Sequence, residues 1–229
     1  MSTSRLPRGD ETGAASRLPN SDEINTTIEA LKRNGFDVRL AEDIADAERI
    51  FWEEIFDRLR PNSVSWGDSM TLLSTNIIPA LRKNPEIELI ETFSERLDRV
   101  EIIRNRKRAL TCDLFLTGTN AVTSKGQLVN LDMTGNRIAG ITFGPENVVL
   151  FIGVNKIVRD IEQAMNRVRT VSAPMNVKRH EDFNTPCRIT GKCADCRSPQ
   201  RICNMWAITE KCYPEGRIKI ILINRDLGL

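Results

Sequence analysis

Four cysteines lie close together near the end of this 229-residue chain, and thiolates are ligands suited to soft metal centres. Cys187, Cys193, Cys196 and Cys203 follow the spacing C-x5-C-x2-C-x6-C. The Cys-x-x-Cys pair allows two thiolates to reach one metal from a tight turn, and nearby arginines would offset the charge of four thiolates. The spacing therefore predicts a metal site, and it favours a 4Fe–4S cluster over zinc.

Other interpretations of the cysteines stay open. A zinc ribbon usually has two Cys-x-x-Cys pairs and this segment has one, but zinc remains the alternative metal. The thiols could also be buried or paired in disulfides without any metal. Cys212, nine residues beyond Cys203, could replace one of the four or lie nearby as a spare thiol.

A second group of polar residues follows the ends of predicted strands. The loop 67–71, GDSMT, lies between a strand and a helix, where backbone amides and hydroxyls attract phosphate or carboxylate. An ordinary helix cap, with Ser69 or Asp68 as N-cap and Gly67 in the turn, is the simpler explanation of that loop. The segment 113–140 is more difficult to explain by turns alone, because its Asn, Thr and Gly residues interrupt strands that are otherwise apolar.

Asn155 and Lys156 follow the predicted strand 147–153 and are expected at the same edge of the sheet as these two loops. Ligands of open α/β sheets gather at the carboxyl ends of strands, so we expect a small anionic ligand there. Lys156 would neutralise that anion, or would be a solvated charge in a first helical turn. The predicted ligand-binding residues are Gly67, Asp68, Ser69, Thr71, Gly118, Thr119, Asn120, Asn130, Asp132, Gly135, Asn136, Arg137, Asn155 and Lys156.

No catalytic residue is predicted. The single histidine, His180, has no nucleophile beside it in the sequence and is interpreted as a surface residue. The chain contains neither a P-loop nor a Gly-rich dinucleotide fingerprint.

The elements that would position these residues alternate between strand and helix. Apolar residues at helical spacing predict helices over 24–31, 44–59, 73–81, 97–104 and 157–168, with a kink at Pro79 and an N-cap at Ser94. Strands are predicted at 36–41, 63–66, 87–91, 113–118, 127–132, 147–153 and 218–223. Ser124-Lys125-Gly126 is typical of a hairpin turn.

The alternation predicts an α/β fold with a mostly parallel sheet flanked by helices. Residues 1–20 are expected to be a disordered tail, and 21–229 a single domain. Within it, 181–216 is rich in Cys, Pro, Arg and Gly and predicts a Cys-rich, loop-dominated insertion before the last strand.

The charge and the hydrophobicity of the sequence exclude some classes of function. Lys and Arg number 33 against 31 Asp and Glu, a net charge of +2, which argues against a general nucleic-acid binder. No run approaches the ~18 apolar residues of a membrane span, and the first residues lack the apolar core of a secretory signal. We therefore expect a cytoplasmic globular protein with no nucleic-acid or membrane partner.

Several long motifs together resemble one family. TGTNAVT, GNR, GVNKIV and TPC-x5-C-x2-C-x6-C are similar to the LUD-domain family of lactate-utilisation proteins, LutC/YkgG-like, and the resemblance covers roughly 21–229. It implies a Rossmann-like sheet of the sugar-isomerase and CoA-transferase type (NagB/RpiA/CoA-transferase-like), with the loop 67–71 and the edge 113–120 facing the ligand. Many short relatives lack the cysteines, so the chain resembles a Cys-rich branch.

The resemblance implies a function in oxidation of L-lactate, or a related small hydroxy acid, as an oxidoreductase component. Multi-subunit iron–sulfur systems perform that oxidation in the family, so other iron–sulfur oxidoreductase subunits are the implied partners. The alternatives are a non-catalytic accessory subunit with structural zinc, and an enzyme acting on a sugar phosphate, nucleotide or folate.

Overall fold

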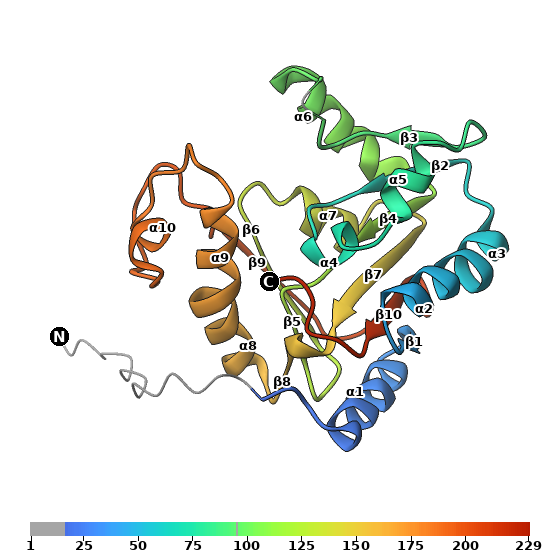
Figure 1. The fold of residues 1–229 in the computed structure, drawn as a ribbon, viewed down its shortest axis with the longest axis horizontal. Helices are drawn as coiled ribbons and strands as arrows, with labels where there is room; N and C mark the ends of the chain where they lie inside the picture. Colours follow the sequence, from blue (N-terminus) through green and yellow to red (C-terminus); the bar gives the residue numbers. More distant parts are fainter. Residues whose placement is uncertain (1–16, 95) are drawn as a thin grey trace.

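A six-stranded sheet forms the centre of the computed structural model, which describes residues 17–94 and 96–229 (Figure 1). Its strand order is β1-β10-β7-β4-β2-β3, and neighbouring strands are parallel throughout. The strands are β1 (Asp37–Ala41), β2 (Ser63–Trp66), β3 (Glu88–Ile90), β4 (Leu114–Thr117), β7 (Asn147–Gly153) and β10 (Ile218–Ile223).

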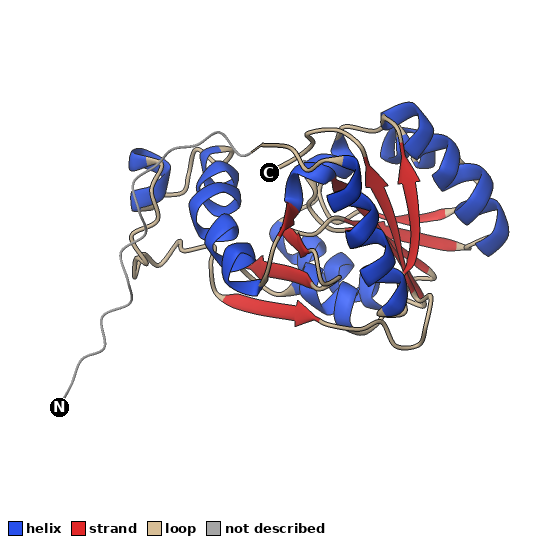
Figure 2. Ribbon diagram, turned by 90° about the horizontal axis from the view of Figure 1, so that it is seen from below, coloured by secondary structure: helices blue, strands red, loops and turns tan. Residues whose placement is uncertain are grey.

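The central strands β7 and β10 are near-continuous apolar runs because helices cover both faces of the sheet. Successive side chains point to opposite faces, so Val148 and Leu150 join one core while Val149 and Phe151 join the other. The first core also contains Ile28 of α1 (Ser21–Arg33). The strands lie between helices in the perpendicular view of Figure 2. The predicted Rossmann-like α/β class is confirmed.

The second core is covered by a continuous helical stretch of three pieces, α2 (Ile44–Arg49), a π-helical segment (Ile50–Phe56) and α3 (Asp57–Leu59). Arg60, with φ 48°, ends it before Pro61, as the sequence predicts.

A smaller sheet that the sequence analysis did not resolve lies beside the first. Its order is β8 (Ile157–Val158), β5 (Ala121–Thr123), β6 (Leu128–Asp132) and β9 (Met205–Thr209). β5 and β6 form the predicted hairpin, with Gly126 at φ +75° in its turn. The helix α8 (Ile161–Arg167) packs on this sheet through Ala164. The prediction of a helix from residue 157 was wrong, because Ile157 pairs with Val122 instead.

Two predicted helix details differ from the structure. The chain breaks before Pro79, between α4 (Met70–Leu73) and α5 (Ile77–Leu81), so Pro79 stands in the first turn of α5, where its missing N–H costs no hydrogen bond. Asp98 rather than Ser94 caps α6 (Arg99–Arg108), because its carboxylate accepts from the Glu101 N–H at 2.8 Å.

The remaining helices are α7 (Asn136–Thr142), α9 (Ala173–Lys178) and α10 (Pro186–Thr190), with short 3-10 turns at Ala109–Thr111 and Val154–Lys156 and a π-helical segment at Val168–Ser172. The predicted Cys-rich insertion, 181–216, contains α10 and β9. Most of the predicted N-terminal tail, residues 1–16, lies outside the described residues. No helix in the described part of the chain is both long enough and apolar enough to cross a membrane.

Candidate functional site

A cleft of about 290 Å³ opens where β2, β4 and β7 end. Asp68 and Ser69 enter it from the turn after β2, Thr119 and Asn120 from the turn after β4, and Lys156 from the turn after β7. This is the carboxyl edge of the parallel sheet, where α/β proteins bind their ligands. Of the predicted ligand-binding residues, those that line the cleft are Asp68, Ser69, Gly118, Thr119, Asn120, Asp132, Asn136, Arg137 and Lys156.

The other predicted residues stand behind the wall of the cleft and support it. Thr71 accepts a hydrogen bond from Lys156, and Asn130 accepts one from Arg137. Asn155 accepts from the Leu227 N–H at 3.2 Å. Gly135, with φ +80°, begins α7. Gly67 allows close packing, since a Cβ there would lie 3.0 Å from both Arg137 Cγ and Thr117 Oγ1.

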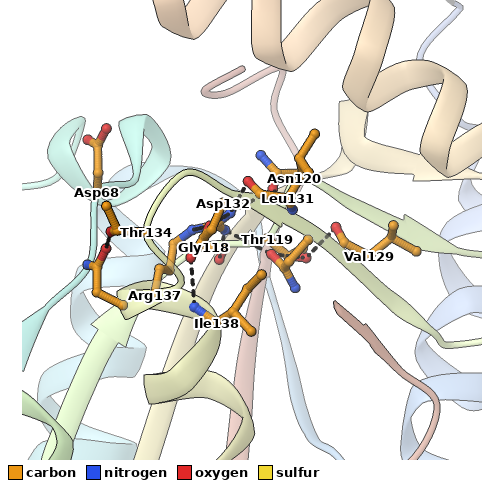
Figure 3. Close-up of polar contacts among 12 residues, drawn as sticks. Asp68, Gly118, Thr119, Asn120, Val129, Leu131, Asp132, Thr134, Arg137 and Ile138 are labelled. Carbon is orange, nitrogen blue, oxygen red and sulfur yellow. Dashed lines mark hydrogen bonds and ion pairs between the residues drawn. The ribbon is translucent and has the colours of Figure 1, made fainter. Parts of the chain in front are cut away.

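Arg137 is buried and fully hydrogen-bonded (Figure 3). Its guanidinium donates to Asp132 Oδ1 at 2.7 and 3.0 Å, to Asn120 Oδ1 at 2.7 Å and to Asn130 Oδ1 at 2.8 Å. It also donates to the carbonyls of Gly118 and Leu131, at 3.1 and 3.3 Å. A guanidinium has five N–H groups, so this set leaves no donor for a ligand. Arg137 therefore joins the end of β4 to the end of β6.

Lys156 lines the same cleft and is almost without partners. Its side chain is 4% exposed, and Nζ donates to Thr71 Oγ1 at 3.0 Å. The described residues supply no carboxylate within ion-pair distance. Burial lowers the pKa of Lys156 to about 7, and the nearby cations Arg167 and Arg137 contribute to the decrease. The alternative interpretation of Lys156 as a solvated first-turn charge was wrong.

Arg167 of α8 is a half-buried cation that sequence reasoning missed. It donates to the Asn120 carbonyl at 2.8 Å, to Ser172 Oγ at 2.9 Å and to the main-chain oxygen of Leu229, the last residue of the sequence, at 3.2 Å. Burial lowers the pKa of Arg167, and Asp226 opposes this effect. The segment 224–229 thus crosses the strand ends over Lys156, and Leu229 lines the cleft.

Two further arginines stand at the cleft, on helices far apart in the sequence. Arg179 pairs with Asp68 at 3.0 Å. The Arg106 guanidinium lies 5.0 Å from the Phe93 ring centre, and its buried Nε has no hydrogen-bond partner among the described residues. Burial lowers the pKa of Arg106, while Asp68 raises it. His180, predicted as a surface residue, is half-buried in the cleft wall with its ring 5.1 Å from that of Phe183.

The cysteine segment lies beside the cleft, and Cys203 is part of its lining. Burial raises the pKa of Cys203 to about 11, and Cys193 and Cys187 are close enough to raise it further, whereas Arg201 and Arg169 lower it. Thiols are the ligands that hold an iron–sulfur cluster, and the arginines would offset the negative charge of four thiolates. In residues 17–94 and 96–229, however, no three Cys, His, Asp or Glu side chains are arranged to hold a metal ion. The metal site at Cys187, Cys193, Cys196 and Cys203 stays a prediction.

The other two cysteines belong to the main core. Cys112 donates to the Ala109 carbonyl at 3.1 Å, and burial raises its pKa to about 12. Cys212 is buried in the core that contains Ile28 and Ile218. Cys212 therefore packs as a core residue and is separate from the cysteine segment.

The chain is similar to known proteins in both its sequence and its fold. The LUD domain family model matches residues 24–223. No curated protein sequence matches the chain. Among solved structures, the crystal structure of a DUF162 family protein from Deinococcus radiodurans is similar, with 12% sequence identity and a TM-score of 0.48. That similarity covers 90% of this chain and 99% of the other, and it is too distant to carry a functional argument.

Proposed function

The chain belongs to the LUD domain family, which is associated with lactate utilisation, and from this premise we propose that the cleft binds a small organic anion. The proposed ligand is a 2-hydroxy acid such as L-lactate or the corresponding 2-oxo acid. The chain would act as a component in oxidation of that acid, with other iron–sulfur oxidoreductase subunits as its partners.

The proposal rests on the buried amine of Lys156, which lines the cleft. Lys156 lies near the buried Arg137 and the half-buried Arg167, and among the described residues it has one hydrogen-bond partner, which is neutral. The side-chain carboxylates that line the cleft are already engaged, Asp132 by Arg137 and Asp68 by Arg179. A buried cation without a counter-charge is costly, so an anion that supplies the counter-charge binds favourably.

The size of the cleft also supports a small ligand. Its volume of about 290 Å³ lies at the lower end of the range of ~300–1,000 Å³ that is usual for small-molecule sites. A three-carbon acid leaves room for water in a cleft of this size. The polar side chains of Asn120, Asn136 and Ser69 supply hydrogen-bond partners for a hydroxyl or carbonyl group.

Thermal denaturation with a ligand panel tests the proposal. L-lactate and pyruvate should raise the Tm of the wild-type chain in a concentration-dependent way, because a ligand that binds the native state stabilises it. Lys156→Met should abolish that increase, and Lys125→Met, at an exposed hairpin position, should keep it. If sugar phosphates or folates raise the Tm and these acids do not, the alternative enzyme class is supported and this proposal fails.

The cysteine segment supports a second part of the proposal, an iron–sulfur cluster on Cys187, Cys193, Cys196 and Cys203. Three of these thiols affect one another's environment, and Arg169 and Arg201 lie beside them. Metal binding commonly orders its own ligands, so we propose that the four thiols come together when the metal is loaded.

Elemental analysis of anaerobically purified chain tests the cluster. Iron and labile sulfide should be present, and Cys193→Ser should lose them while Cys112→Ala, in the core, retains them per folded molecule. Stoichiometric zinc without iron would contradict the cluster and support the accessory-subunit alternative.

A further inference from the structure

The amine of Lys156 can react with a ligand as well as supply positive charge. It is buried in a cleft that admits a small molecule, and its one hydrogen bond to the described residues goes to the neutral hydroxyl of Thr71. The charged groups that act on it are Arg167 of α8 and Arg137 of α7, and both are cations. Each of these features favours the neutral amine, so near pH 7 the ammonium form that attracts an anion and the neutral form that can react are both present.

A neutral lysine amine in a desolvated site is a nucleophile toward carbonyl carbon. An exposed lysine is almost entirely protonated at neutral pH and lacks the lone pair that attacks. The structure thus distinguishes Lys156 from surface lysines by burial and by neighbouring charge. Thr71 holds Nζ in place, and Gly228 approaches it closely, since a Cβ on Gly228 would lie 3.0 Å from Nζ.

We propose that Lys156 forms an imine with the carbonyl carbon of a 2-oxo acid bound in the cleft. The Nζ lone pair adds to the carbonyl carbon and gives a carbinolamine, which then loses water and forms a C=N bond. One amine and one ketone become one imine and one water, so no oxidant or reductant is required. The proposal rests on the proposed function, because it needs the cleft to accept a small organic acid.

The charge of the product suits this site. A protonated imine carries one positive charge, and the ligand's own carboxylate, attached to the imine carbon, lies next to it. The ligand therefore brings its counter-charge to a position where no carboxylate of the described residues lies within ion-pair distance. Arg106 lines the same cleft, and its Nε has no hydrogen-bond partner among the described residues.

Reductive trapping tests this proposal. The full chain is incubated with pyruvate and cyanoborohydride at neutral pH, and the products are mapped by peptide mass spectrometry. We expect one adduct per chain at Lys156, roughly tenfold or more above any other lysine. Lys156→Arg, which keeps the charge but cannot form the imine, should lose the adduct, whereas Lys125→Arg should keep it. L-lactate, which has no carbonyl to attack, should give none.

The outcomes separate this proposal from the function on which it rests. A rise in Tm with pyruvate but no adduct at Lys156 would overturn the imine and leave anion binding intact. No rise in Tm and no adduct would overturn both. An adduct spread evenly over surface lysines, and unchanged in Lys156→Arg, would also overturn the imine.

Discussion

Two buried cations line the same cleft and differ in almost everything except charge. Arg137 donates to one carboxylate, two amide oxygens and two carbonyls, and it has no donor left. Lys156 donates to one hydroxyl, and its positive charge has no counter-charge within ion-pair distance among the described residues. A buried cation whose hydrogen bonds are all made within the protein stabilises the fold. A buried cation in a cleft that lacks such partners is available to bind a ligand. The comparison therefore assigns a structural role to Arg137 and a ligand-binding role to Lys156.

At neutral pH, removing the carboxylate that pairs with Arg137 should have the greatest effect on stability. Asp132→Ala removes the carboxylate from a buried ion pair and the acceptor of the Ile138 N–H, which lies 2.8 Å away. Breaking such a pair leaves an uncompensated buried charge and should cost about 3 kcal/mol of unfolding free energy. Urea denaturation measures the loss.

The matched control for that variant is a surface ion pair. Arg49 and Glu53 are 3.4 Å apart and exposed, so Glu53→Ala should change the unfolding free energy by less than about 0.5 kcal/mol. Equal losses for the two variants would show that the Arg137 network contributes no more than a surface pair.

The next effect concerns Lys156 and the pH dependence of stability. Its pKa is about 7 in the folded chain against an ordinary 10.5, so between these values the unfolded chain binds one more proton than the folded chain. Stability therefore rises with pH in that window, by about 1.4 kcal/mol per pH unit for this group, and the contribution is flat below pH 7. The difference in unfolding free energy between wild type and Lys156→Met should follow this slope.

Lys125→Met provides the reference for that measurement, since Lys125 is exposed. Its unfolding free energy should run parallel to that of the wild type over the same pH range. A constant difference between wild type and Lys156→Met would show that Lys156 titrates normally and that the contrast with Arg137 is not electrostatic.

The sequence predicted the main sheet better than the site. The strands β7 and β10 are long apolar runs bounded by turns, so local pattern suffices to find them. By contrast, β5, β8 and β9 have two to five residues, and pairings with distant strands define them, as between Asp132 and Met205. Short strands of this kind carry no periodicity that a sequence pattern can detect.

At the site, sequence reasoning selected the polar residues at strand ends but not the partners that assign their roles. The sequence does not show that Arg137 turns back onto Asp132 or that Lys156 is buried. Arg106 lies on the highly charged α6, Arg167 at the end of α8 and Arg179 at the C-cap of α9, where an arginine is usually solvated. They become site residues only because the fold brings those helices to the carboxyl edge of the sheet.

A smaller effect is expected from a substitution in the segment 224–229, which lies over Lys156. Gly228 has φ +75°, and a Cβ there would lie 3.0 Å from Lys156 Nζ and closer still to the Thr71 hydroxyl. Gly228→Ala should displace the segment 224–229, admit water to the amine and raise the pKa of Lys156 toward its ordinary value. The pH midpoint of pyruvate trapping reports that pKa and should move upward.

Gly216→Ala separates this contact from backbone strain. Gly216 has φ +74°, nearly the same as Gly228, but a Cβ there meets nothing within 4 Å. Both variants should therefore lose about 1 kcal/mol of stability from the left-handed conformation, and only Gly228→Ala should shift the trapping midpoint. If the trapping midpoint stays unchanged in Gly228→Ala, the segment 224–229 does not maintain the neutral form of Lys156. Burial at the strand ends would then be the feature that lowers the pKa of Lys156.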